Sequence, residues 1–128
     1  MDVLLDTHAL LWFYGGDESL PVKLREQIKS FDNRCYLSMA SLWEITIKLS
    51  LGKLELGTSL REFFDFIDRN NFQIIPIEFE HLLTLQQLPL FHKDPFDRII
   101  IAQALTEQLT VASKDRFFQD YALPMVWE

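Results

Sequence analysis

Cysteine and glycine are scarce in this sequence of 128 residues, which contains one Cys and four Gly. A single thiol cannot form an internal disulfide, and it leaves too few sulfur ligands for a structural zinc site. We expect Cys35 to be a buried, unpaired thiol in a reducing compartment. Because the few glycines and five prolines leave no stretch that resembles a linker, the whole range 1–128 is predicted to form one domain.

Long hydrophobic runs are also missing, in particular at the start of the sequence. Asp2 stands where a signal peptide would carry positive charge, and the apolar run 3–5 is interrupted at once by Asp6. This run is too short to cross a membrane. We therefore expect a cytoplasmic protein that has no membrane partner.

Positive charge is in short supply as well. Twelve Lys and Arg stand against 19 Asp and Glu, which gives a net charge of −7. Lys and Arg supply most of the non-specific affinity of proteins for nucleic acids, because they neutralise phosphates. The composition therefore argues against a general polyanion-binding surface, so that any nucleic acid must be bound locally, through a metal ion or a small basic patch.

Apolar residues, in contrast, make up 48% of the chain and include 11 Phe, which is ample material for a core. Short apolar runs alternate with segments of helical periodicity. We predict strands at 2–6, 34–38, 72–77, 110–113 and 124–127, and helices at 7–14, from Pro21 onward, and at 39–50, 59–70, 78–88 and 95–108. This alternation predicts an α/β fold, in which helices flank a central, mostly parallel sheet of four to five strands. The apolar arc of helix 39–50 is so wide that the core or a partner must cover more than one side.

Acidic residues recur where the predicted strands end or where the next helices begin. They are Asp6, Glu44, Asp94, Asp97 and Asp115. A parallel sheet places its binding site beyond the carboxyl ends of its strands, so these acids are predicted to share one edge of the sheet. Such a cluster of carboxylates would repel itself, and a divalent cation would remove the conflict. Oxygen ligands in this number favour Mg²⁺, or Mn²⁺, over Zn²⁺.

Helix capping is the ordinary alternative for each of these acids, because carboxylates near helix N-termini accept unpaired N–H groups. Ser41 and Glu44 have the spacing of a capping box. Asp94 directly precedes Pro95 and is typical of an N-cap, whereas Asp97 then falls at the third helical position, where no cap is needed. For Asp6 and Asp115, a helix cap and a metal site are equal alternatives when each acid is considered alone.

Other polar residues lie beside these acids in the sequence. The hydroxyls of Thr7, Ser38 and Ser113 are candidate auxiliary groups that orient a carboxylate or a metal-bound water, with a local helix cap as the equal alternative. His8 and His92 are the histidines near this edge. For both we expect packing or hydrogen bonding rather than metal ligation, because their spacing does not match that of a zinc site.

Four segments of the chain resemble the PIN-domain toxins of the VapC family, which belong to bacterial toxin–antitoxin pairs. They are LLDTHALLW (4–12), YLSMASLWEITIK (36–48), HKDPFDRIIIAQA (92–104) and VASKDRFF (111–118). They span nearly the whole chain in the order and spacing of the family. The resemblance implies an acidic pocket, metal-dependent cleavage of RNA, homodimerisation, and inhibition by a cognate antitoxin protein.

The family's acids fall on named positions of this sequence. The resemblance assigns the four catalytic acids to Asp6, Glu44, Asp97 and Asp115, and Asp94 belongs to the DPFD form found in part of the family. Our hypothesis is that the three aspartates of this catalytic set hold Mg²⁺, while Glu44 completes the metal shell or helps to deprotonate the attacking water. Asp94 stays open between a helix cap and an auxiliary site residue.

Basic residues near the acids are candidates for contacts with the RNA backbone, although a solvated side chain is the commoner role of each: Lys48, Lys93, Arg98 and Arg116. An antitoxin would be expected to place an Arg or Lys against the acidic pocket, since a guanidinium pairs well with carboxylates.

Two other functions compete with the nuclease. One is a non-catalytic PIN-like module that only binds a partner through its Phe-rich helices. The other is an aspartyl-phosphate phosphotransferase, because Asp6 followed by Thr7 is similar to a carboxylate nucleophile beside a hydroxyl. Enzymes of the haloacid-dehalogenase type carry a second Asp two residues after the first, and His8 stands at that position here.

Overall fold

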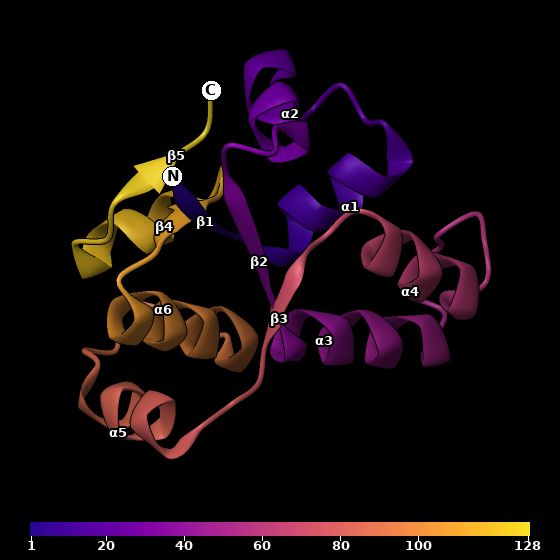
Figure 1. Cartoon of the computed structure of the whole chain (residues 1–128). Helices are drawn as coiled ribbons and strands as arrows, with labels where there is room; N and C mark the ends of the chain where they lie inside the picture. The colour runs from indigo at the N-terminus through magenta and orange to yellow at the C-terminus, as the bar shows by residue number, and fades with distance from the viewer.

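A computed structural model describes all residues, 1–128, and contains a five-stranded sheet in the order β3-β2-β1-β4-β5 (Figure 1). Every neighbouring pair of strands is parallel. The α/β fold predicted from the sequence is therefore confirmed. The strands are β1 (Asp2–Leu5), β2 (Arg34–Ser38), β3 (Gln73–Ile75), β4 (Thr110–Ala112) and β5 (Met125–Val126). The helices are α1 (Thr7–Gly15), α2 (Val22–Lys29), α3 (Met39–Ser50), α4 (Leu60–Arg69), α5 (Phe79–Gln87), α6 (Pro95–Glu107) and the 3-10 helix η1 (Arg116–Tyr121).

The strand order reverses direction at β1. From β1 the chain builds outward through β2 to β3, and it then crosses back through α5 and α6 to place β4 on the other side of β1. At such a reversal the segments that follow the two central strands diverge, which opens a crevice at their carboxyl ends. Asp6 follows β1 and Ser113 follows β4, so both residues lie at this crevice.

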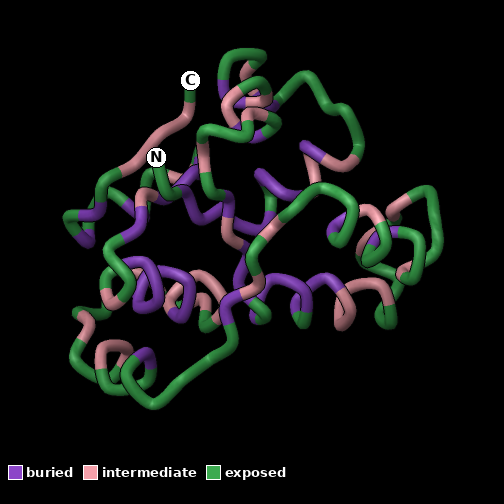
Figure 2. The backbone as a smooth tube through the Cα atoms, in the orientation of Figure 1, coloured by how far each residue is buried: buried purple, intermediate pink, exposed green.

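Both faces of the sheet are covered. Along β1, Val3 and Leu5 pack with α1, α2 and α3, whereas Leu4 packs on the opposite face with Ile100 and Ile101 of α6. This alternation follows from the pleat of a strand, which points successive side chains to opposite faces. Figure 2 shows the result, because buried residues follow the strands and the inward sides of the helices. The rigid double-sided core fixes where the strand ends lie.

Some predicted element ends differ from the structure. β3 is confined to Gln73–Ile75 and is shorter than the predicted strand 72–77, because Pro76 has no N–H to donate to a neighbouring strand.

In α3 the chain itself buries Ala40, Leu42 and Ile45 but leaves Met39 and Trp43 48% and 58% exposed. The apolar arc of this helix therefore extends beyond the core of a single chain.

None of the helices combines the length and the apolar character that crossing a bilayer requires.

Candidate active site

Asp6 is the most deeply buried acid at the crevice, with 4% of its surface exposed. It is the N-cap of α1, and its carboxylate accepts a hydrogen bond of 2.7 Å from the N–H of Ala9. Burial raises the pKa of Asp6 from 3.8 to about 6, although Ser113, Ala9 and His8 each favour the charged form. The helix cap predicted as an alternative is therefore present, and it does not compensate the buried charge.

Asp97 lies at the third position of α6 and is turned into the same crevice. Its Oδ2 lies 2.8 Å from Nε2 of His92. Burial raises the pKa of Asp97, the hydrogen bond with His92 opposes this effect, and the negative charges of Asp94 and Glu44 raise the pKa further. The charge of Asp97 in turn raises the pKa of Asp6. Acids from α3, α6 and the end of β1 thus share one electrostatic environment.

Glu44 reaches the crevice from α3, with 6% of its surface exposed. Its Oε1 accepts a hydrogen bond of 2.8 Å from the Thr7 hydroxyl, and its Oε2 lies 2.9 Å from Nζ of Lys48. The capping-box interpretation of Glu44 is wrong. The N-cap of α3 is Ser38, whose hydroxyl accepts from the N–H of Ala40, while Ser41 is buried inside the helix 3.0 Å from the Thr7 hydroxyl.

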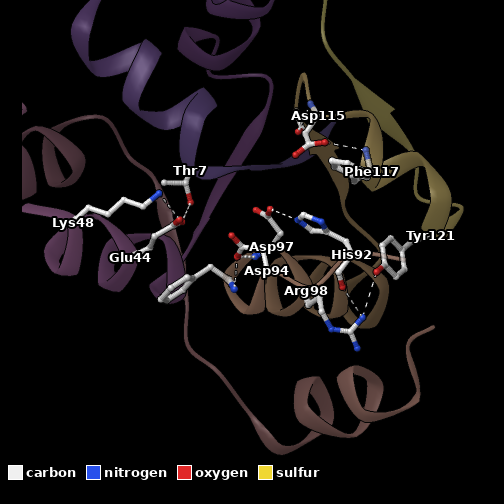
Figure 3. Close-up of polar contacts among 12 residues, drawn as sticks. Thr7, Glu44, Lys48, His92, Asp94, Asp97, Arg98, Asp115, Phe117 and Tyr121 are labelled. Atoms are coloured by element: carbon white, nitrogen blue, oxygen red, sulfur yellow. Dashed lines mark hydrogen bonds and ion pairs between the residues drawn. The ribbon is translucent and has the colours of Figure 1, made fainter. Parts of the chain in front are cut away.

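Asp115 and Asp94 approach from the remaining two sides. Asp115 follows β4 and caps η1 by accepting a hydrogen bond of 3.0 Å from the N–H of Phe117. Its own N–H donates to the hydroxyl of Ser113. Asp94 caps α6 by accepting from the N–H groups of Phe96 and Asp97, as its position before proline predicted. Figure 3 shows Glu44, Asp97 and Asp115 around one common space, although they come from three different parts of the chain.

His92 was predicted only to be packed or hydrogen-bonded, and it is both, in contacts with residues on two sides of this space. Its ring donates to or accepts from Asp97 and is stacked on Phe117, with ring centroids 4.8 Å apart and planes inclined by 10°. Phe117 was not predicted as a site residue. Its position two residues after Asp115 is the only feature that distinguishes it in the sequence. Ligand atoms of His92, Asp94 and Asp97 all lie within 4.8 Å of one another.

The donor set fits a hard divalent cation. The carboxylates are the main ligands available, and the raised pKa values of Asp6 and Asp97 indicate negative charge that nothing in the chain fully compensates. Lys48 is the one Lys or Arg that forms an ion pair with these acids. Mg²⁺ and Mn²⁺ prefer oxygen ligands and supply the missing positive charge, whereas a zinc site would need more nitrogen or sulfur than His92 provides.

The basic residues selected from the sequence differ in their surroundings. Lys93 and Arg116 are exposed beside the crevice and form no ion pair. Arg98 points away from it (Figure 3), and its guanidinium donates to carbonyl oxygens of the connection between α5 and α6, among them that of Pro89, and to the hydroxyl of Tyr121. Arg98 thus holds in place the segment that carries His92 and Asp94.

The chain is similar to known proteins in both sequence and structure. A family model described as PIN domain matches residues 3–123. No curated protein sequence is significantly similar to the chain. Among solved structures, VapBC2 from Rickettsia felis bound to a promoter DNA fragment has 18% identity and a TM-score of 0.74, with 100% of each chain covered.

Two further solved structures are similar over nearly the full length. FitAcB from Neisseria gonorrhoeae has 18% identity and a TM-score of 0.65, with 96% of this chain and 95% of that chain covered. VapBC-1 from nontypeable Haemophilus influenzae has 16% identity and a TM-score of 0.69, with coverage of 98% and 97%. At these identities the likeness is evidence of a shared fold.

Proposed function

This chain belongs to the PIN-domain family, and we propose that it is a Mg²⁺-dependent endoribonuclease, the toxin component of a toxin–antitoxin pair. The observation that supports the proposal is the electrostatic coupling of Asp97 with Asp6, Asp94 and Glu44, together with the burial that raises the pKa of Asp6 and of Asp97. Acids held in this way against their mutual repulsion are typical of a site that binds a cation. Nuclease chemistry on phosphodiesters uses such a cation.

Each acid has a proposed role. Asp6, Asp97 and Asp115 hold the metal ion, Mg²⁺ or alternatively Mn²⁺, which when bound polarises the phosphoryl oxygen and lowers the pKa of bound water. Glu44 completes the shell or accepts the proton of the attacking water. The Thr7 hydroxyl and Lys48 keep the Glu44 carboxylate turned toward the crevice. His92 orients the Asp97 carboxylate in the same way, as groups that contact metal ligands commonly do.

Several neighbours of the acids have supporting roles in this proposal. The hydroxyls of Ser38 and Ser113 accept hydrogen bonds from the N–H groups of Ala40 and Asp115 and so fix the backbone where β2 and β4 end. Asp94 fixes the start of α6 as its N-cap. These contacts hold the acids in position before substrate binds, which lowers the cost of organising the site.

RNA is proposed to cross the crevice, with Lys93 and Arg116 on the exposed rim in contact with its phosphates. Lys48 is shared between Glu44 and the approaching backbone. Once a cation neutralises the acids, Lys48 can exchange its ion pair with Glu44 for a contact with a phosphate. Arg98 is bound within the chain and acts by holding the segment before α6.

Proposed partners follow from the similar structures and from the surface. A similar solved structure from Klebsiella pneumoniae is named a toxin–antitoxin complex, and by analogy a cognate antitoxin would inhibit this chain in the cytoplasm. A basic side chain of the antitoxin would pair with the acids at the crevice. The exposed apolar side chains Met39 and Trp43 of α3 are proposed to be covered in a homodimer, since large apolar residues gathered on a surface commonly mark an interface.

Cleavage of RNA by the purified chain tests this proposal. We expect labelled single-stranded RNA to be cut in the presence of Mg²⁺ and to stay intact with EDTA. Asp97→Asn removes one charge at nearly constant shape and should abolish cleavage. If the variant cuts RNA as fast as the unmodified chain, or if EDTA has no effect, the metal-dependent nuclease is rejected and a binding module remains.

A further inference from the structure

A cavity of about 400 Å³ adjoins the acids and is not accounted for by the metal site. It lies between α1 and the connection from α3 to α4, and it shares Thr7 and Lys48 with the crevice. A molecule bound at the acids can therefore extend into it without leaving the protein surface.

The wall formed by α1 is aromatic. His8 is exposed, and its ring lies on Trp12 with centroids 5.6 Å apart and planes inclined by 31°. Trp12 is in turn packed edge-on against Trp127, at 5.7 Å, and it borders the main core. His8 is thus an exposed planar ring on a supported base, two residues after Asp6 in the sequence.

Charged groups complete the lining. Lys48 and Lys53 carry the positive charges, and Asp17 and Glu55 carry the negative ones. Lysine side chains meet phosphate oxygens, while carboxylates accept hydrogen bonds from the amino groups of nucleobases. An apolar peptide segment would match the leucines and aromatic rings of this lining but would leave its lysines and carboxylates unpaired. The combination of a planar ring, lysines and carboxylates fits a nucleotide better.

We propose that this cavity is a base-binding subsite for the nucleotide next to the scissile phosphate of a single-stranded RNA, with the base stacked on His8. The assignment rests on the proposed nuclease function and makes it more specific. Stacking on an aromatic side chain accepts any base, and the carboxylates then discriminate among bases by their amino groups. Lys53 contacts the phosphate on the far side of the bound base.

Binding to the inactive Asp97→Asn variant tests the subsite separately from catalysis. Fluorescence anisotropy would follow a labelled ten-nucleotide RNA of mixed sequence in the presence of Mg²⁺. Adding His8→Ala should weaken binding about tenfold, the equivalent of about 1.4 kcal/mol, in line with the cost of losing one base–aromatic stack. His8→Phe keeps a planar ring and should restore most of the affinity. An abasic ribose-phosphate oligomer of the same length should bind equally well with and without the His8 substitution.

Matched controls separate stacking from general surface effects. Phe31→Ala removes an aromatic ring that is 92% exposed on a distant loop, and it should leave RNA binding unchanged. Lys53→Ala should weaken binding, whereas Lys23→Ala on α2 should not. Equal affinities of the His8→Ala and unmodified forms, or an equal loss for the abasic oligomer, would overturn the subsite. RNA cleavage by the unmodified chain with Mg²⁺ would still support the nuclease in that case, and absence of cleavage would reject the nuclease independently.

Discussion

The hydroxyl of Thr7 donates a hydrogen bond of 2.8 Å to Oε1 of Glu44, although 37 positions separate the two residues in the chain. This contact joins the first turn of α1 to the first half of α3 directly beside Asp6. It is buried, so the Glu44 carboxylate is held at the crevice instead of turning to solvent. The packing of α1 on α3 therefore helps to set the geometry of the acid cluster.

Thr7→Val removes this hydroxyl at nearly constant volume. We expect the free energy of unfolding to fall by about 1 to 3 kcal/mol, because a buried acceptor loses its donor. We expect kcat for RNA cleavage to fall about tenfold while KM changes little, since Glu44 is misaligned rather than removed. Thr84→Val is the control, because Thr84 forms a hydroxyl pair of 2.9 Å with Thr106 far from the crevice. It should affect stability alone, and an equal loss of kcat in both variants would contradict the role of Thr7.

Asp6→Asn should stabilise the metal-free protein at high pH. Burial raises the pKa of Asp6 in the folded state from 3.8 to about 6, so the folded protein binds this proton more tightly than the unfolded chain does. Stability is therefore lost as the pH rises from about 4 to 6, by about 3 kcal/mol in total. Denaturant unfolding should show the variant more stable than the unmodified chain at pH 8 by up to this amount, with the difference vanishing near pH 4. Asp2→Asn, on the exposed start of the same strand, should show no such trend.

Added Mg²⁺ or Mn²⁺ should restore the stability that the folded protein loses at high pH when the buried Asp6 is charged. A cation that binds only the folded state raises its stability, by about 2.7 kcal/mol at a concentration of 100 times Kd. The melting temperature of the unmodified chain should thus rise with added metal at pH 8. The rise should shrink below pH 6, because Asp6 must lose its proton to bind a cation. Asp97→Asn should show little or no rise, and an undiminished rise would place the metal elsewhere.

His92→Ala should weaken metal binding more than it weakens the fold. The ring is hydrogen-bonded to Asp97 and stacked on Phe117, so its loss frees the Asp97 carboxylate to rotate. Removing a group that orients a metal ligand typically costs 10- to 100-fold in metal affinity, roughly. Isothermal titration with Mn²⁺ measures this effect. His92→Gln retains a hydrogen-bond donor and should recover part of the affinity. Unchanged Mn²⁺ affinity in His92→Ala would show that His92 serves packing alone.

Trp43→Glu should disrupt the proposed homodimer. Trp43 is 58% exposed on α3 and packs edge-on against Phe96, at 5.3 Å between ring centroids. A charge there would be buried unpaired in an interface, which is costly. Light scattering coupled to gel filtration should report a monomer for this variant and a dimer for Phe31→Glu, where the ring lies on a distant loop. A dimer in both variants would place the interface on another face.

Much of the fold follows from local sequence pattern. The ends of β2 and α3 were predicted to the residue, because an apolar run gives way to helical periodicity at Ser38. The capping box at Ser41 was wrong because two serines three residues apart offer similar local patterns. Only the extended backbone of Ser38 decides which of them begins the helix. The early end of β3 is different, because Pro76 in the sequence already indicates that the strand cannot continue its pairing.

That Asp6 and Asp97 share one environment could be predicted from the sequence, and their contacts could not. Parallel strands share an edge for their carboxyl ends, so the positions of Asp6 and Asp115 after strands and of Asp97 at a helix start predict a common crevice. The contact of Thr7 with Glu44 and the stacking of His92 on Phe117 join elements that the sequence does not relate. Such pairs depend on how helices pack on the sheet.

The sequence by itself determined the alternation of strands and helices and the placement of an acid after β1 and after β4, because periodicity and capping act over a few residues. Tertiary structure decided the strand order, the burial that raises the pKa of Asp6, and the side chains that hold each carboxylate. Desolvation and Coulomb interaction depend on distance through space, and that distance exists only once both faces of the sheet are packed.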